Sequence, residues 1–193
     1  MFAVVPFERL PAIDAAFATR FADDTGAAGL LHRSTPVLSL LGSCGIKKAW
    51  NDRQNSAGHL AIPLLSRQLV GDIPMIAQLL ADVGVDLACL DDSLPIESRR
   101  LQGSTNHGFY VANAAEARDS RGRLIIASQP FVAACGIHTV FGMAGSYLDG
   151  TMLAAISFTT EKVSKMTIDR FPSIIADFKM ATMKLALNGR IYP

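Results

Sequence analysis

Apolar side chains recur at helical spacing in three stretches of the chain, and this pattern predicts three amphipathic helices. The first covers about residues 6–23, with its apolar positions at Phe7, Leu10, Ile13, Ala16 or Phe17, and Phe21. The second covers residues 73–83 and is stopped by Gly84. The third covers residues 168–188 and is ended by Asn188-Gly189, with apolar-face positions at Phe171, Ile174, Ile175, Phe178, Thr182 and Leu185.

Shorter apolar runs without helical spacing predict strands between these helices. Residues 36–41, 85–90 and 107–112 are expected to be strands, and residues 59–65 a strand end or a buried loop. The clearest pair lies within 131–160. Residues 137–148 and 151–159 are both rich in apolar types, and Leu148-Asp149-Gly150 between them has the chemistry of a tight hairpin turn.

Composition supports one folded domain. Of the 193 residues, 50% are hydrophobic and 18% are charged, so a sizeable core is expected and disorder is not. Residues 1–35 are interpreted as an N-terminal helical extension and residues 36–190 as the core of a single domain. The order of elements predicts an α+β fold with a central antiparallel β-sheet flanked by helices.

Charge and hydropathy narrow the classes of partner. The net charge of +1 gives no general argument for binding nucleic acid. No apolar run approaches the roughly 20 residues of a membrane helix. The first residues, MFAVVPFERL, show no secretory signal, and the three cysteines are widely spaced, so a reducing, cytoplasmic location is expected.

Two segments resemble GAF-type sensory domains. The first is Phe109-Tyr110-Val111-Ala112-Asn113-Ala114, which is followed by a polar loop and then by Gly136-Ile137-His138-Thr139 entering the hairpin. GAF domains often have a similar extended segment and a Gly-Ile turn, with an acid in place of Asn113 and a base in place of His138. The likeness implies a GAF/PAS-like sheet with a small-molecule ligand held between the sheet and its covering loops.

A further segment is similar to one that precedes GAF-like units in the sensory regions of bacterial signalling kinases. It contains Trp50-Asn51-Asp52-Arg53, Ser56, Gly58-His59 and Ala61-Ile62-Pro63-Leu64. Together the likenesses span about residues 36–190. They leave no room for a kinase, cyclase or DNA-binding output module, so the resemblance implies that a sensor of this kind would act on a separate partner.

The residues suggest several candidate contacts for such a ligand. Asp52 and Arg53 could hold a polar group while Trp50 covers it, because a guanidinium offers fixed-fork hydrogen bonds. A loop anchored by a buried Trp50, with Asp52 and Arg53 as a surface pair, explains the same residues without a ligand. The full set of candidate ligand-binding residues is Trp50, Asp52, Arg53, His107, Phe109, Phe131, Cys135, His138 and Phe141.

Catalytic and metal motifs are weak. The four histidines lack HxH, HxxxH or HExxH spacing, so no metal site is expected, although His107, His138 and Cys135 could meet in space. The glycines of residues 142–146 do not form a nucleophile elbow, and no phosphate-binding loop is present. The enzymatic alternative uses Cys44, Cys89 and Cys135, because GAF-fold free methionine sulfoxide reductases employ a nucleophilic thiolate and resolving cysteines.

The resulting hypothesis is a non-catalytic regulatory domain, with no particular cofactor indicated. A small ligand would order the connections at 91–106 and 113–130 and so change the packing of the terminal helices against a signalling partner. The apolar stripes of the 7–22 and 168–188 helices could also build a homodimer. The alternatives are a thiol-dependent enzyme of the sulfoxide reductase type and a ligand-free interaction scaffold.

Overall fold

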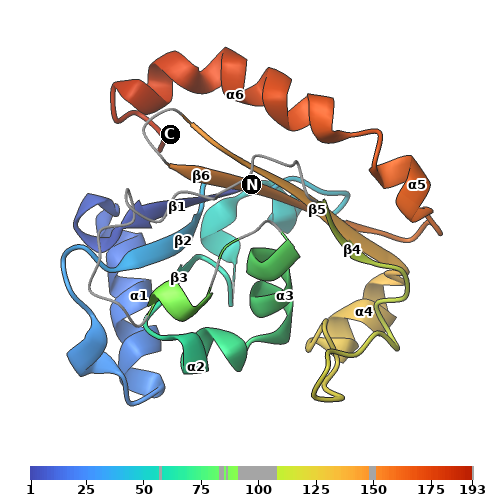
Figure 1. Ribbon diagram of the computed structural model, residues 1–193, viewed down its shortest axis with the longest axis horizontal. Coiled ribbons are helices and arrows are strands. Elements are labelled where there is room, and N and C mark those ends of the chain that lie inside the picture. The colour runs from blue at the N-terminus through green and yellow to red at the C-terminus, as the bar shows by residue number, and fades with distance from the viewer. Residues whose placement is uncertain (57, 83–84, 86, 91–107, 148–150, 193) are drawn as a thin grey trace.

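The computed structural model describes residues 1–56, 58–82, 85, 87–90, 108–147 and 151–192. These residues form one antiparallel sheet with helices on both of its faces (Figure 1). The strands are β1 (Phe2–Pro6), β2 (Pro36–Leu40), β3 (Ala61–Pro63), β4 (Gly108–Val111), β5 (Thr139–Ser146) and β6 (Met152–Thr159).

The sheet consists of two three-stranded meanders joined along one seam. Its strand order is β3-β2-β1-β6-β5-β4, and all neighbouring strands are antiparallel. Within each meander the strands follow chain order, so most pairing is between strands that are consecutive in the sequence. The seam joins β1 to β6 through three residue pairs, Phe2 with Ala154, Ala3 with Leu153, and Val4 with Met152.

The register divides the strand residues cleanly between two faces, because paired residues in an antiparallel sheet point to the same side. One face carries the main core, to which the strands contribute Phe2, Leu38, Leu40, Ile62, Phe109, Val111, Val140, Ala144, Met152 and Ala154. The opposite face carries two smaller clusters, to which the strands contribute Ala3, Val5, Val37, Ala61 and Leu153. We call these the main-core face and the opposite face.

Helices α2 (Arg67–Gly71), α3 (Pro74–Asp82) and α4 (Gln129–Cys135) cover the main-core face through Val70, Met75, Ile76, Leu79, Leu80 and Val132. Helix α1 (Ala12–Asp24) packs on the opposite face, where Ala18 meets Val37 and Ala61. Helices α5 (Lys165–Ile168) and α6 (Pro172–Leu187) follow β6, and Figure 1 shows α6 running along the sheet on the side away from α2 and α3. Short 3-10 helices are η1 (Phe7–Arg9), η2 (Ala28–Leu30), η3 (Lys48–Asn51), η4 (Arg53–Asn55) and η5 (Leu87–Leu90).

Helix α6 contacts the sheet through one stripe of residues. Ile175 and Ala186 are buried, and the Thr182 hydroxyl lies 2.6 Å from the hydroxyl of Tyr147. The Lys179 side chain lies over Gly145, and Phe171, just before the helix, stacks on Phe141 of β5 with 6.2 Å between ring centroids. The chain then continues to Ile191 and Tyr192, which pack against the cluster on the opposite face that consists of Ala3, Val5, Tyr147, Leu153 and Ala186.

The α+β class with a central antiparallel sheet is confirmed, as are the expected strands at 36–41 and 107–112 and the two strands of the hairpin. The hairpin turn at 148–150 and the connection at 91–106 lie outside the described residues. Residues 87–90 form a 3-10 helix where a strand is expected, and residues 129–135 form α4, a helix that the sequence pattern did not predict. Pro130 in the first turn and the left-handed Gly136 at the C-cap, with φ of +63°, account for α4.

The beginning of the chain differs most from expectation. Residues 2–6 form a strand between β2 and β6, and the helix begins only at Ala12. The first 35 residues are therefore built into the sheet and its covering layer, where the sequence pattern suggests an extension. The expected apolar stripe of this helix is also displaced by one position, because Ile13 is 45% exposed while Asp14 is fully buried.

Candidate functional site

Three aromatic rings from distant parts of the chain meet beside the main-core face. Phe131 of α4 lies between Trp50 of η3 and Phe158 of β6, with edge-to-face contacts at centroid distances of 5.8 Å and 5.6 Å. Trp50 and Phe131 are half-buried, and Phe158 remains 39% exposed. Since edge-to-face aromatic pairs are favourable and core rings are normally covered, this partly open trio offers apolar surface to a further group.

A lysine and a thiol border the rings. The Lys47 ammonium lies 5.0 Å from the centroid of the Trp50 ring, within cation–π distance, and 3.6 Å from the Sγ of Cys135. Lys47 is exposed, so its charge is available to a molecule that approaches from solvent. We define Lys47, Trp50, Phe131, Cys135 and Phe158 as the aromatic–lysine site.

Local backbone features position these side chains. Gly45 lies so close to the Trp50 ring that a Cβ at this position would be 2.6 Å from Cε3, so glycine permits the ring to lie against the chain. Asn51 Oδ1 accepts a hydrogen bond of 2.8 Å from the Gly45 N–H and closes the same loop. On the other side, the C-cap Gly136 turns the chain from α4 into β5 directly after Cys135.

The nine residues expected to contact a ligand fall into separate places. Trp50, Phe131 and Cys135 meet in the aromatic–lysine site. His107 lies outside the described residues. Phe109 is fully buried in the main core and Phe141 faces the opposite side of the sheet against Phe171.

His138, Asp52 and Arg53 make contacts within the protein. His138 is half-buried at the entry to β5, where its Nδ1 lies 3.3 Å from the hydroxyl of Thr139. The Asp52 carboxylate caps η4 by accepting a 2.9 Å hydrogen bond from the N–H of Gln54. Arg53 forms an ion pair with Asp14 of α1.

The Arg53–Asp14 pair is the core of a buried polar network that the sequence analysis missed. Arg53 Nη1 donates to both carboxylate oxygens of Asp14 at 2.9 Å and to the carbonyl oxygen of Leu40 at 3.0 Å. The Ser39 hydroxyl donates to Asp14 at 2.8 Å. The signal that could have indicated the pair is an acidic residue among the apolar residues of a predicted helix, together with an arginine in the connection between β2 and β3.

Tyr192 borders this network from the C-terminal segment. The Arg53 guanidinium carbon lies 5.7 Å from the centroid of the Tyr192 ring. The Tyr192 hydroxyl is buried, and burial raises the pKa of this phenol. The network therefore joins the loop that carries Trp50 to α1, to β2 and to the chain that follows α6.

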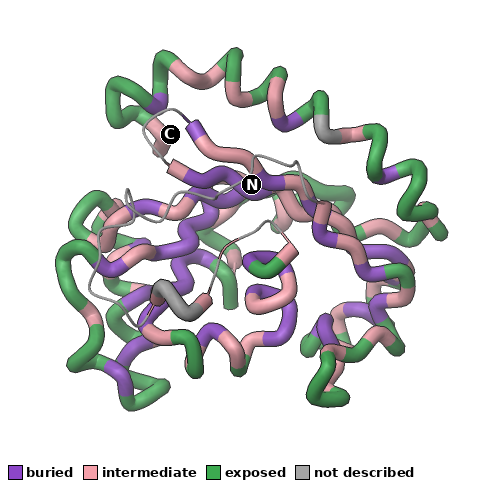
Figure 2. Tube along the Cα trace, in the orientation of Figure 1, coloured by how far each residue is buried: buried purple, intermediate pink, exposed green. Residues whose placement is uncertain are grey.

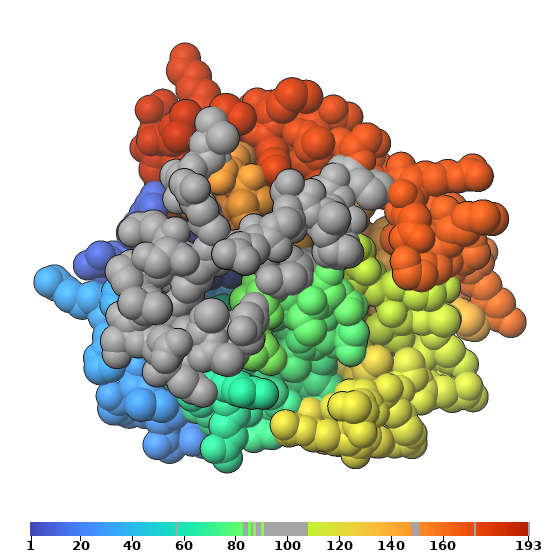
Figure 3. Space-filling view, in the orientation of Figure 1, coloured from blue at the N-terminus to red at the C-terminus, as the bar shows by residue number. Residues whose placement is uncertain are grey.

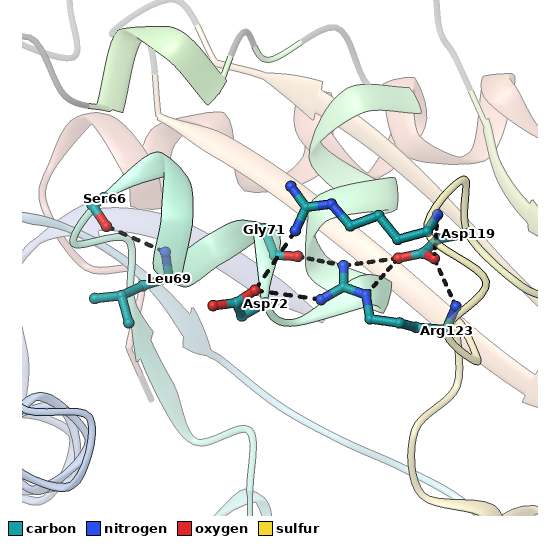
Figure 4. Close-up of polar contacts among 7 residues, drawn as sticks. Ser66, Leu69, Gly71, Asp72, Asp119 and Arg123 are labelled. Carbon is teal, nitrogen blue, oxygen red and sulfur yellow. Dashed lines mark hydrogen bonds and ion pairs between the residues drawn. The ribbon is translucent and has the colours of Figure 1, made fainter.

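A second polar cluster fastens the covering layer of the main-core face (Figure 4). Arg123 donates to the carbonyl oxygen of Gly71 at 2.6 Å and forms an ion pair with Asp119 at 2.8 Å. Asp72 lies 3.4 Å from Arg123 and 3.7 Å from Arg121. The 119–123 loop is thereby held against the end of α2, and Ser66 caps the start of that helix by accepting from the N–H of Leu69.

Within this cluster, the Asp119 carboxyl is the group whose pKa is shifted. Desolvation opposes its charge, but hydrogen bonds from the backbone N–H and the guanidinium of Arg123 and from the Arg121 N–H outweigh it and hold the pKa of Asp119 below its usual value. The cluster is thus a structural clamp, charged at neutral pH.

No three His, Cys, Asp or Glu side chains within the described ranges come together as ligands of a metal ion would. None of the helices in those ranges combines the length and the apolar character needed to cross a bilayer. Comparison with known proteins found no matching family model, curated protein or solved structure.

Proposed function

We propose that this chain is a non-catalytic, GAF/PAS-like regulatory domain that binds a small molecule at the aromatic–lysine site and signals to a separate partner. A six-stranded antiparallel sheet with helices on both faces supports the resemblance in fold. The observation that carries the proposal is the partly open trio of Trp50, Phe131 and Phe158, which meets beside the main core instead of being closed within it.

The residues favour a planar ligand with an anionic group. Aromatic rings bind flat apolar molecules through stacked or edge contacts. The Lys47 ammonium, which lies over the Trp50 ring, would pair with a carboxylate or phosphate on the same molecule. A neutral or cationic molecule of the same shape would gain the ring contacts but not this charge interaction, and we therefore expect it to bind less tightly.

A physical connection leads from this site to the opposite face. Trp50 and Arg53 lie three residues apart on the same loop. Arg53 contacts Asp14 of α1, and it also contacts the ring of Tyr192, which follows α6. A ligand that fixes Trp50 would restrict the loop and bias the position of Arg53, and with it the packing of α1 and the C-terminal segment. Such a ligand acts by favouring one of two arrangements, and its differential affinity limits the shift.

A thiol-dependent reductase is the second candidate, and one observation favours it. The Lys47 Nζ lies 3.6 Å from Cys135 Sγ, so a cationic group lies beside the sulfur that would act as the nucleophile. The Cys135 thiol would take the oxygen of a sulfoxide, giving the sulfide and a cysteine sulfenic acid. A second thiol would then condense with the sulfenic acid to a disulfide and release water. Cys44 and Cys135 are both free thiols.

The single tryptophan of the chain is in the site, so its fluorescence reports on ligand binding directly. Planar aromatic carboxylates and purine nucleotides would be titrated, each beside an uncharged analogue, with tryptophan emission and the melting temperature as readouts. We expect a saturable emission change together with stabilisation, which reaches about 2.7 kcal/mol at a ligand concentration of 100 Kd.

Matched variants separate the explanations. Lys47→Gln should weaken the anionic ligands and leave the uncharged analogues unchanged, whereas Lys48→Gln at the exposed neighbouring position should affect neither. Equal effects of the two variants, or stabilisation without any change in Trp50 emission, would place the ligand elsewhere. If the protein turns over methionine sulfoxide and Cys135→Ser abolishes this activity, the reductase hypothesis is established instead. If neither binding nor turnover is detected, the ligand-free interaction scaffold is the remaining hypothesis.

A further inference from the structure

Helix α6 carries more exposed large hydrophobic residues than any other described element. Five of the ten large hydrophobic residues that are exposed in the described ranges lie on it: Ile174, Phe178, Met180, Leu185 and Leu187. Figure 2 shows that most of the helix is exposed or half-buried, and Figure 3 shows it along the upper margin of the molecule. A surface helix normally presents polar residues to water, so this surface calls for a partner.

One part of this surface has the spacing of a helix–helix interface. Ile174, Phe178, Ala181 and Leu185 are all exposed and are separated by four, three and four residues. That is the alternation of a heptad repeat, in which such residues form a single seam along a helix. Each lies one position before a residue that faces the sheet or lies against it, so the seam is on the flank of α6 and is not used by the fold.

Two charges of opposite sign border the seam. Asp177 and Lys184 are exposed, lie seven residues apart, and so occupy equivalent positions in consecutive heptads along the outer edge of the seam. Neither makes an ion pair or hydrogen bond through its side chain with another residue of the described ranges. Both charges are therefore available to a second molecule.

We propose that this flank of α6 binds the same flank of a second copy of this chain, with the two helices antiparallel about a two-fold axis. In that arrangement Ile174 lies opposite Leu185 and Phe178 lies opposite Ala181. Of the four layers, two pair side chains of equal size and two pair a large side chain with a small one. The same axis brings Asp177 of each helix to Lys184 of the other, which forms two symmetric ion pairs. The seam is thus complementary to itself in both shape and charge.

A parallel pair in register does not have this complementarity. Each residue would meet its own counterpart, so that Phe178 would face Phe178 and Ala181 would face Ala181. Asp177 would lie near the level of Thr182, with no opposite charge to meet. The distribution of size and charge along α6 favours the antiparallel pair.

Sedimentation velocity over a range of protein concentrations tests the proposal with a charge swap. The full chain is expected to dimerise. Asp177→Lys and Lys184→Asp should each raise the dimer dissociation constant about tenfold, because each turns two attractive pairs into two repulsive ones. The double variant carrying both changes restores opposite charges in the antiparallel pair and should return the constant to within about threefold of the original.

Two further variants separate this surface from the rest of the helix. Phe178→Glu puts a charge into the seam and should yield a monomer, with the folded state verified by circular dichroism. Met180→Lys changes a residue that is 67% exposed on the other flank of α6 and should leave the dissociation constant unchanged.

Several results would overturn the proposal. A wild-type chain that stays monomeric up to its solubility limit would show that α6 does not bind a second copy, and binding to lipid vesicles by that monomer would assign the surface to a membrane. A dimer that the charge swap fails to restore would exclude the antiparallel arrangement. A dimer that is weakened by Met180→Lys but not by Phe178→Glu would place the interface on the other flank.

Discussion

The buried ion pair between Arg53 and Asp14 leads to a stability prediction whose magnitude follows from its contacts. Arg53 supplies Asp14 with two hydrogen bonds of 2.9 Å, and the only other hydrogen bond to this carboxylate from the described residues is that of Ser39. Arg53→Met keeps most of the aliphatic stem but removes the charge. The fully buried Asp14 carboxylate would then lack a counter-ion, and breaking a buried pair in this way typically costs about 3–5 kcal/mol.

Urea denaturation and calorimetry would measure the loss. For a domain of this size, about 3–5 kcal/mol corresponds to a fall in melting temperature of roughly 6–20 °C. Arg33→Met is the matched control, because Arg33 is exposed and surface substitutions usually change stability by no more than about 0.5 kcal/mol.

A double variant tests the cause. Asp14→Leu combined with Arg53→Met replaces both charges by apolar groups, so no unpaired charge remains, and it should recover most of the loss seen with Arg53→Met alone. If the two substitutions instead lower the free energy of unfolding additively, or if Arg53→Met behaves like Arg33→Met, the pair does not stabilise the fold in the way argued.

Two other predictions concern the sheet and the clamp that covers it. Gly142→Ala should destabilise the protein by about 1–3 kcal/mol, because the added Cβ would lie 2.8 Å from the carbonyl oxygen of Ala155 in the neighbouring strand. Gly29→Ala is the control, since the Cβ added there meets open space and should be tolerated. Thermal unfolding compares the two variants, and equal melting temperatures would contradict the argument from close approach. Because the pKa of Asp119 is lowered in the folded state, its charge stabilises the protein above the unfolded-state value of about 4, and this contribution is lost as the pH falls through the lower folded-state value. The stability difference between wild type and Asp119→Asn should therefore be full at neutral pH and disappear in acid, and a difference that does not depend on pH would show that the carboxylate charge is not the cause.

The sequence predicted those parts of the fold in which local pattern and tertiary packing agree. The apolar run of β6 and the turn chemistry before it were sufficient to predict the second strand of the hairpin. Residues 2–6 were missed because Pro6 and Phe7 also fit the start of a helical stripe, and only pairing with β2 and β6 makes them a strand. Helix α4 was missed because five apolar or small residues in a row fit a strand as well as a short helix.

The candidate site was harder to predict because its contacts join distant segments. Trp50, Phe131 and Cys135 were each named, yet nothing in the sequence indicated that Lys47, 88 residues before Cys135, would lie beside that thiol. Asp14 was overlooked because a carboxylate beside apolar helix positions is normally exposed. Its burial depends on Arg53, 39 residues later, and periodicity carries no information about such a partner.

The seam between the two meanders has a consequence for synthesis on the ribosome. Strands β1, β2 and β3 can pair as soon as residue 63 has emerged, but the other edge of β1 stays open until Met152–Ala154 is made. During that interval one edge of the apolar segment Phe2–Val5 has no partner strand, and this edge is accessible to neighbouring chains. Protection of this edge during translation, by a chaperone or by rapid elongation, is therefore expected to govern how much of the protein reaches its folded state.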